Sequence, residues 1–178
     1  MALFTTPPLS IIDLPADSRH HSGPRGTWPI KYVVLHTTQG IDSRKWLSTD
    51  PASDVSAHRL MQRGPYDPIT KLGGHYKILP DNFIANHTGF GTVGNYKPGK
   101  WPNLNAVSLG VELEQKGNQQ ITDYQYEQIS SMYLEWAGLY YYPSILLHRD
   151  VDPERRTDPV NFDLNHFWYL VDTKRRAM

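Results

Sequence analysis

Two histidines and one aspartate are the residues of this sequence whose types and spacing best suit chemistry. His148 and Asp158 lie ten residues apart, just after the apolar pair 146–147, and His36 ends the apolar run 32–35. Two imidazoles and a carboxylate suit zinc, and an ion held by three side chains keeps its fourth position open for water. The set therefore predicts a hydrolase. Spacing alone also allows unrelated structural histidines, because His36 is far from His148 in the sequence.

Two further polar residues could take part in hydrolysis. Glu112 lies on the polar side of the alternating segment 106–114, where a carboxylate near a zinc-bound water could pass its proton to a leaving amine. Arg156, two residues before Asp158, could donate hydrogen bonds to a developing oxyanion. By pattern alone, the simpler interpretations are a solvated strand face for Glu112 and a surface position for Arg156.

Length and charge favour one domain without a nucleic-acid partner. A chain of 178 residues has room for one sizeable core, and its 18 basic and 18 acidic residues cancel. That balance lacks the basic patch expected of a nucleic-acid binder. The sequence contains no cysteine, so disulfides are excluded and any metal must be held by nitrogen and oxygen atoms.

The first residues show no export signal, because they lack a basic start followed by an apolar stretch of about 7 to 15 residues. No segment approaches the roughly 20 apolar residues that span a bilayer. We therefore expect synthesis in the cytoplasm without a signal peptide, and no stable membrane insertion.

The apolar pattern predicts an α/β fold, a single domain with a mixed central β-sheet flanked by helices. Strands are expected at 30–36, 58–62, 75–79, 83–85, 106–114 and 144–148, and helices at 42–48, over about 18 residues after Thr122, and at 163–174. Thr122 and Gln125 form a capping box at the start of the long helix. Within the helix at 42–48, Trp46 and Leu47 are expected to face inward.

Two segments outside these elements have compositions of their own. Residues 1–29 are rich in Pro, Gly, Ser and His and are expected to form an arm packed on the core, while residues 30–178 form the main domain. Segment 88–105 is expected to be an irregular loop, and a loop of this length is usually functional. Its Tyr96 and Trp101 could stack on a ligand beside a cleft, and packing against the body of the protein is an equal alternative.

Six segments together resemble the zinc-dependent N-acetylmuramoyl-L-alanine amidases, a family that contains phage endolysins, bacterial anhydromuropeptide amidases and peptidoglycan recognition proteins. They are VVLHTT (33–38), SAH (56–58), YKILP (76–80), NHTG (86–89), NAVSLGVE (105–112) and the segment 148–159. The resemblance extends from about residue 30 to residue 170. Six segments in the order of the family make chance agreement a poor explanation.

The resemblance implies a ligand set and a scissile bond. His36, His148 and Asp158 would hold one Zn²⁺ ion, and the substrate would be peptidoglycan or a muropeptide, cut between N-acetylmuramic acid and L-alanine. Glu112 matches the catalytic glutamate of the anhydromuropeptide type. Other branches have a tyrosine at the position of Ala57, and its absence here favours Glu112 for the proton transfer.

Three more residues are assigned through the resemblance. Arg156 stands where many members have a lysine that stabilises the oxyanion, and arginine keeps the positive charge with a different geometry. His87 and Asn105 match residues beside the cleft, so the resemblance implies that they bind substrate rather than metal.

Three biological roles fit this resemblance. We expect a monomeric phage-type endolysin that acts on the cell wall after its release. The alternatives are a cytoplasmic amidase that recycles anhydromuropeptides and a peptidoglycan-binding module without catalysis. The complete ligand set with Glu112 argues against the last of these.

Overall fold

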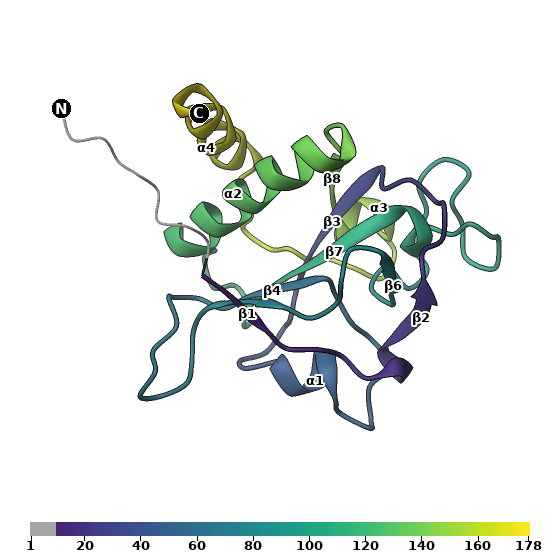
Figure 1. Ribbon diagram of the computed structural model, residues 1–178, viewed down its shortest axis with the longest axis horizontal. Helices are drawn as coiled ribbons and strands as arrows, with labels where there is room; N and C mark the ends of the chain where they lie inside the picture. The colour runs from purple at the N-terminus through teal and green to yellow at the C-terminus, as the bar shows by residue number, and fades with distance from the viewer. Residues whose placement is uncertain (1–9) are drawn as a thin grey trace.

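Six strands form the central sheet of the computed structural model, which describes residues 10–178 (Figure 1). Their order across the sheet is β1-β5-β4-β7-β3-β8. Strands β3, β4, β7 and β8 run parallel, β5 runs antiparallel to β4, and β1 pairs in parallel with β5. The bounds are β1 (Ile11–Asp13), β3 (Tyr32–Thr37), β4 (Arg59–Met61), β5 (His75–Lys77), β7 (Ser108–Leu113) and β8 (Ser144–Leu147). The predicted mixed sheet flanked by helices is confirmed.

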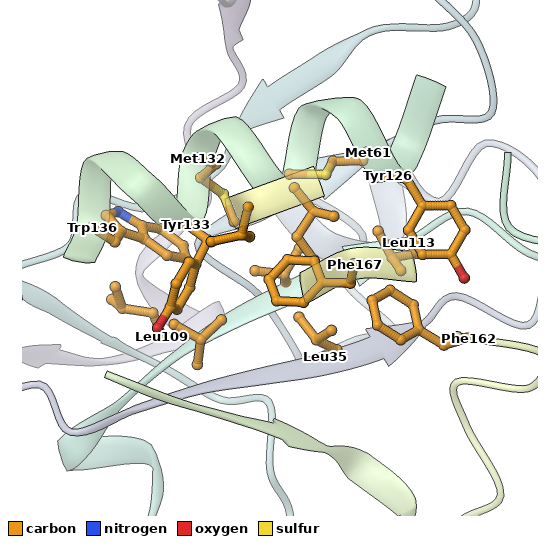
Figure 2. Close-up of a cluster of buried hydrophobic side chains, with 14 of the residues drawn as sticks. Leu35, Met61, Leu109, Leu113, Tyr126, Met132, Tyr133, Trp136, Phe162 and Phe167 are labelled. Atoms are coloured by element: carbon orange, nitrogen blue, oxygen red, sulfur yellow. The ribbon is translucent and has the colours of Figure 1, made fainter. Parts of the chain in front are cut away.

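Helices α2 (Asp123–Tyr140) and α4 (Leu164–Ala177) lie together on one side of the sheet (Figure 1). The capping box predicted at Thr122 is present, and α2 is 18 residues long. Trp136 and Phe167 are fully buried between these helices and the sheet. Figure 2 shows this core, to which the sheet contributes Leu35, Met61, Leu109 and Leu113. None of the helices within residues 10–178 is both long and apolar enough to cross a membrane.

The opposite side of the sheet is covered by shorter elements. They are the ribbon of β2 (His21–Pro24) and β6 (Phe83–Ala85), the helices α1 (Arg44–Ser48) and α3 (His148–Val151), and the 3-10 helices η1 (Ser18–His20) and η2 (Asn105–Val107). Val34 packs here against Leu104, Val107 and Val151. The elements of this layer are shorter than α2 and α4.

Side chains along a strand alternate between the two sides of the sheet, and His36 and Glu112 point to this second side. Val33 and Leu35 face the helical core, so His36 points the other way, together with Val34. In the register of β3 and β7, Val34 lies opposite Gly110 and His36 opposite Glu112. Both sides of β7 pack against other segments, as expected for a central parallel strand. Ser108, Gly110 and Glu114 are buried and Glu112 is partly buried, so these residues do not form a solvated face.

Trp46 departs from the prediction for the helix at 42–48. Leu47 is buried against Leu60, but the neighbouring Trp46 is 46% exposed. Adjacent residues of a helix point about 100° apart, and the buried side of this five-residue helix carries Leu47 and Ser48, which leaves Trp46 at its edge. The prediction that Trp46 faces inward is therefore wrong.

The loop predicted at 88–105 is irregular as expected, except that Asn105 starts η2. Tyr96 packs on Tyr32 and accepts a hydrogen bond from Lys31, and Trp101 is 57% exposed.

The N-terminal segment contributes directly to the sheets. The expected arm was 1–29, of which residues 1–9 lie outside the described part. Strand β1 pairs with β5, and β2 pairs with β6. Arg25, which directly follows β2, is only 4% exposed. The boundary between arm and main domain stays a prediction.

Candidate active site

His36, His148 and Asp158 converge at one edge of the sheet. His36 lies near the end of β3, His148 directly follows the parallel neighbour β8, and Asp158 lies in the loop before α4. Parallel strands bring their carboxyl ends to the same edge, where ligands commonly bind in α/β sheets. All three side chains are buried, and their potential ligand atoms lie within 4.8 Å of one another. The structure thus brings the predicted ligand set together.

The carboxylate of Asp158 is held by several contacts. Its Oδ2 accepts a hydrogen bond from the backbone N–H of Thr37 at 3.1 Å and lies 3.2 Å from Nδ1 of His148. The backbone N–H of Arg149 donates to the carbonyl oxygen of Asp158. Burial alone would raise the pKa of Asp158, but the hydrogen bond and charge of His148 outweigh it and lower the pKa. Asp158 is therefore an anion at neutral pH, as a metal ligand must be.

The donor set fits a four-coordinate metal ion. The 3.2 Å between Nδ1 of His148 and Oδ2 of Asp158 is close to the roughly 3.3 Å that separates two ligand atoms of tetrahedral zinc. Within residues 10–178, Nε2 of His148 is buried without a hydrogen-bond partner. A buried polar atom without a partner is costly, and because an imidazole gives one nitrogen to an ion, an ion bound through Nδ1 would leave Nε2 without a partner among these residues.

Glu112 is a second carboxyl group in the cleft, beside Asp158. Burial, and next the negative charge of Asp158, raise the pKa of Glu112 to about 8, although Arg156 acts in the opposite direction. Its Oε2 is buried and has no hydrogen-bond partner among the described residues. A carboxyl group with a pKa near neutrality can both take up and release a proton during catalysis.

A cleft of about 310 Å³ connects these residues to the surface. Its walls include Glu112 and the three potential metal ligands His36, His148 and Asp158. The exposed side chain of Arg156 and the apolar side chains of Trp46 and Val55 also line it. Tyr96 and Trp101 are not among the residues found to line it. Trp46 is thus the large aromatic side chain of this cleft, and its sequence context contained no signal for that position.

His87 lies between the cleft and the interior. Its Nδ1 is 3.0 Å from Nε2 of His36, and its Nε2 is 3.1 Å from Oγ of Ser108. Burial, with His58 and His148 as further causes, lowers the pKa of His87 well below its ordinary value. The ring is therefore neutral at pH 7. It lines the cleft, and its predicted contact with substrate stays a prediction.

Asn105 contacts the backbone of His87. It is not among the residues found to line the cleft. Its Oδ1 accepts hydrogen bonds from the backbone N–H and the hydroxyl of Thr88, at 2.9 and 2.8 Å, and a longer one from the N–H of His87. Its side chain holds the turn that carries His87. Its predicted role in substrate binding stays a prediction.

Arg25 is a buried residue near the site that sequence reasoning missed. Its guanidinium donates to the backbone carbonyls of five residues, Asp81, Phe83, Asn105, Ala106 and Ser108. Burial lowers the pKa of Arg25 to about 10, so it keeps its charge at neutral pH. Backbone carbonyls leave no trace in the sequence, which is why no motif pointed to this residue.

Comparison with known proteins identifies related sequences and folds. The model of the family described as N-acetylmuramoyl-L-alanine amidase matches residues 26–161. No curated protein sequence is significantly similar to this chain.

Solved structures share the fold. AmpD superimposes with a TM-score of 0.73 at 22% identity, over 90% of this chain and 94% of AmpD. AmiD from E. coli, in complex with the substrate anhydro-N-acetylmuramic acid-L-Ala-D-γ-Glu-L-Lys, has a TM-score of 0.67 at 23% identity, over 82% of this chain and 59% of AmiD. The endolysin LysCS from Clostridium intestinale, an N-acetylmuramoyl-L-alanine amidase, has a TM-score of 0.65 at 17% identity, over 91% of this chain and 95% of LysCS.

Proposed function

The chain belongs to the N-acetylmuramoyl-L-alanine amidase family, and we propose that it cuts the bond between N-acetylmuramic acid and L-alanine with one Zn²⁺ ion held by His36, His148 and Asp158. Family membership makes it an amidase that acts on peptidoglycan-type substrates. The observation that carries the zinc-dependent mechanism is the cluster of three buried potential ligands in one cleft with Glu112.

Each residue of the cleft has a separate role in the proposed reaction. When bound, zinc polarises the substrate carbonyl and lowers the pKa of water at the metal to roughly 7. Glu112 takes a proton from the attacking water and gives it to the amine nitrogen as the carbon–nitrogen bond breaks. In the metal-free protein burial raises the pKa of Glu112, and the positive charge of a bound ion would act in the opposite direction. The guanidinium of Arg156 donates hydrogen bonds to the carbonyl oxygen while negative charge develops there.

Arg156→Ala is expected to lower kcat by about 10- to 100-fold, somewhat less than the loss of a fully buried oxyanion donor, because this side chain is exposed. Arg156→Lys keeps the charge and should retain most of the activity. Steady-state kinetics on a soluble muropeptide measure both variants.

Arg155→Ala is the matched control for Arg156, because Arg155 pairs with Asp152 and lies over the ring of Phe90, and the cleft lining named above does not include it. It should retain the parent kcat. An Arg156→Ala variant with the parent kcat would remove Arg156 from the mechanism.

We further propose that the protein is a monomeric phage-type endolysin, made in the cytoplasm and acting on the cell wall after release. Segment 63–74, which joins β4 to β5, and segment 88–105 are long connections, and together with the N-terminal arm they favour this role. A recycling amidase is the second candidate, since AmpD matches over nearly its whole length. A full ligand set with Glu112 argues against a binding module without catalysis.

An assay on two substrates separates these roles. The purified chain, with its zinc content measured, is given either intact sacculi or a soluble anhydromuropeptide, with and without chelator. We expect release of stem peptides from sacculi at a rate at least comparable to that on the soluble substrate. Hydrolysis of the soluble substrate alone would replace the endolysin role with the recycling one.

A further inference from the structure

A line of three hydrogen bonds leads from His36 into the interior of the protein. Nε2 of His36 is 3.0 Å from Nδ1 of His87. Nε2 of His87 is 3.1 Å from Oγ of Ser108, and this hydroxyl is 2.7 Å from the carbonyl oxygen of Leu104. Neither Leu104 nor Ser108 is among the residues found to line the cleft. The line thus connects the cleft to the backbone just before η2.

The far end of this line determines the direction of every bond in it. A carbonyl oxygen can only accept, so the hydroxyl of Ser108 donates to Leu104 and accepts from Nε2–H of His87. A neutral imidazole carries one proton, so Nδ1 of His87 is an acceptor and Nε2–H of His36 donates to it. The lone pair of His36 is then on Nδ1. Nδ1 of His36 takes no part in the contact with His87, so it is free to bind a metal.

The ring of His87 is held in this orientation from behind. A Cβ at Gly110 would lie 2.6 Å from Cγ of His87, so only glycine leaves room for the ring. Asn105 holds the backbone of the turn at His87 and Thr88. Arg25 in turn binds the carbonyls of Asn105 and Ser108.

We propose that His87, oriented by Ser108, is a positioning residue that holds the ring of His36 in the tautomer and orientation needed to bind the metal. This inference rests on the proposed function, because His36 must be a zinc ligand. It assigns His87 a role through His36 and not through the substrate. Metal-binding histidines commonly donate their second ring N–H to a fixed acceptor, and loss of that acceptor weakens metal binding or activity by roughly 10- to 100-fold.

The test measures zinc affinity directly, by competition between the metal-free protein and a fluorescent chelator. His87→Leu removes the acceptor and is expected to weaken zinc binding by about 10- to 100-fold. His87→Asn retains an oxygen acceptor near the position of Nδ1 and should recover most of that loss. Ser108→Ala frees the proton of His87 and should weaken binding in the same direction, by less.

His75→Leu is the matched control. His75 is fully buried, and the register places it opposite Met61, on the helical side of the sheet. Its replacement should leave zinc affinity unchanged, whatever it does to stability. Thermal unfolding of each metal-free variant shows whether it is folded. The visible absorption of the Co²⁺-substituted proteins should change in His87→Leu and resemble the parent in His87→Asn.

The outcomes separate this inference from the proposed function. If folded His87→Leu binds zinc as tightly as the parent, or if His87→Asn binds as weakly as His87→Leu, the positioning role is overturned while a zinc-dependent parent retains its proposed function. If the parent binds no zinc and chelator leaves its activity intact, both proposals fail.

Discussion

His148→Ala, or removal of the metal by a chelator, is expected to lower amide hydrolysis by at least about a thousandfold. A Lewis acid at the carbonyl supplies several kcal/mol to such a reaction, and each 1.36 kcal/mol is about a factor of ten in rate. His148 is one of only three protein ligands proposed, so its loss leaves too few to hold the ion. Initial rates on a soluble muropeptide and the zinc content of each protein measure the effect.

His166→Ala serves as the control for His148→Ala. His166 lies on α4, on the helical side of the sheet, and its ring contacts Tyr126. This variant should retain both zinc and the parent rate. Addition of Zn²⁺ should restore the chelated parent but not His148→Ala. A parent enzyme that keeps its full rate after complete removal of the metal would contradict the proposed mechanism.

Glu112→Gln is expected to lower kcat by about 10²- to 10⁴-fold, the usual contribution of a general acid–base residue, while zinc stays bound. The amide is nearly isosteric with the carboxyl group but cannot accept or release the proton. Glu114→Gln is the matched control on the same side of the sheet. Glu114 accepts hydrogen bonds from Gln62 and from the backbone N–H of Asp42, so it should influence stability and leave kcat near the parent value.

The raised pKa of Glu112 also predicts how stability depends on pH in the metal-free protein. In the folded protein the pKa is about 8, against an ordinary value of 4.5. Between these values the folded state holds a proton that the unfolded chain has lost, so stability falls as the pH rises through this window. Glu112→Gln lacks this dependence and should be more stable than the parent by roughly 2 to 5 kcal/mol at pH 8.

Urea unfolding of both metal-free proteins at pH 5 and pH 8 tests this dependence. The stability difference between Glu112→Gln and the parent should be small at pH 5 and large at pH 8. An equal difference at both pH values would show that the carboxyl group is not destabilised by its surroundings. Equal kcat values for Glu112→Gln and the parent, with zinc bound in both, would remove the proposed proton transfer.

The elements of the fold were predictable because they depend on local signals. A capping box and an apolar stripe at helical spacing define α2, and β6 occupies the predicted residues 83–85. Propensity, capping and periodicity act over a few residues, so a sequence reveals them directly. Several bounds differ from the predicted ones. β4 and β5 are shorter than predicted, and His148 begins α3 instead of ending a strand.

Contacts between distant segments were not predictable in the same way. Trp46 was expected inside and instead forms a wall of the cleft. Arg25 is buried among carbonyls contributed by two other segments, 81–83 and 105–108. Aromatic and basic residues occur on surfaces, in cores and in clefts alike. Their environment depends on which segments fold against them.

The candidate site, too, has some features that the sequence shows and others that depend on contacts between distant segments. The sequence by itself determined the types of its residues, two histidines and an aspartate with the donors that zinc prefers, and showed an apolar run directly before each histidine. Only the tertiary structure decided that these three meet, that burial raises the pKa of Glu112, and that His87 contacts His36. The physical reason is that donor chemistry belongs to each side chain, whereas distance, burial and hydrogen-bond direction arise where strands far apart in the sequence pair.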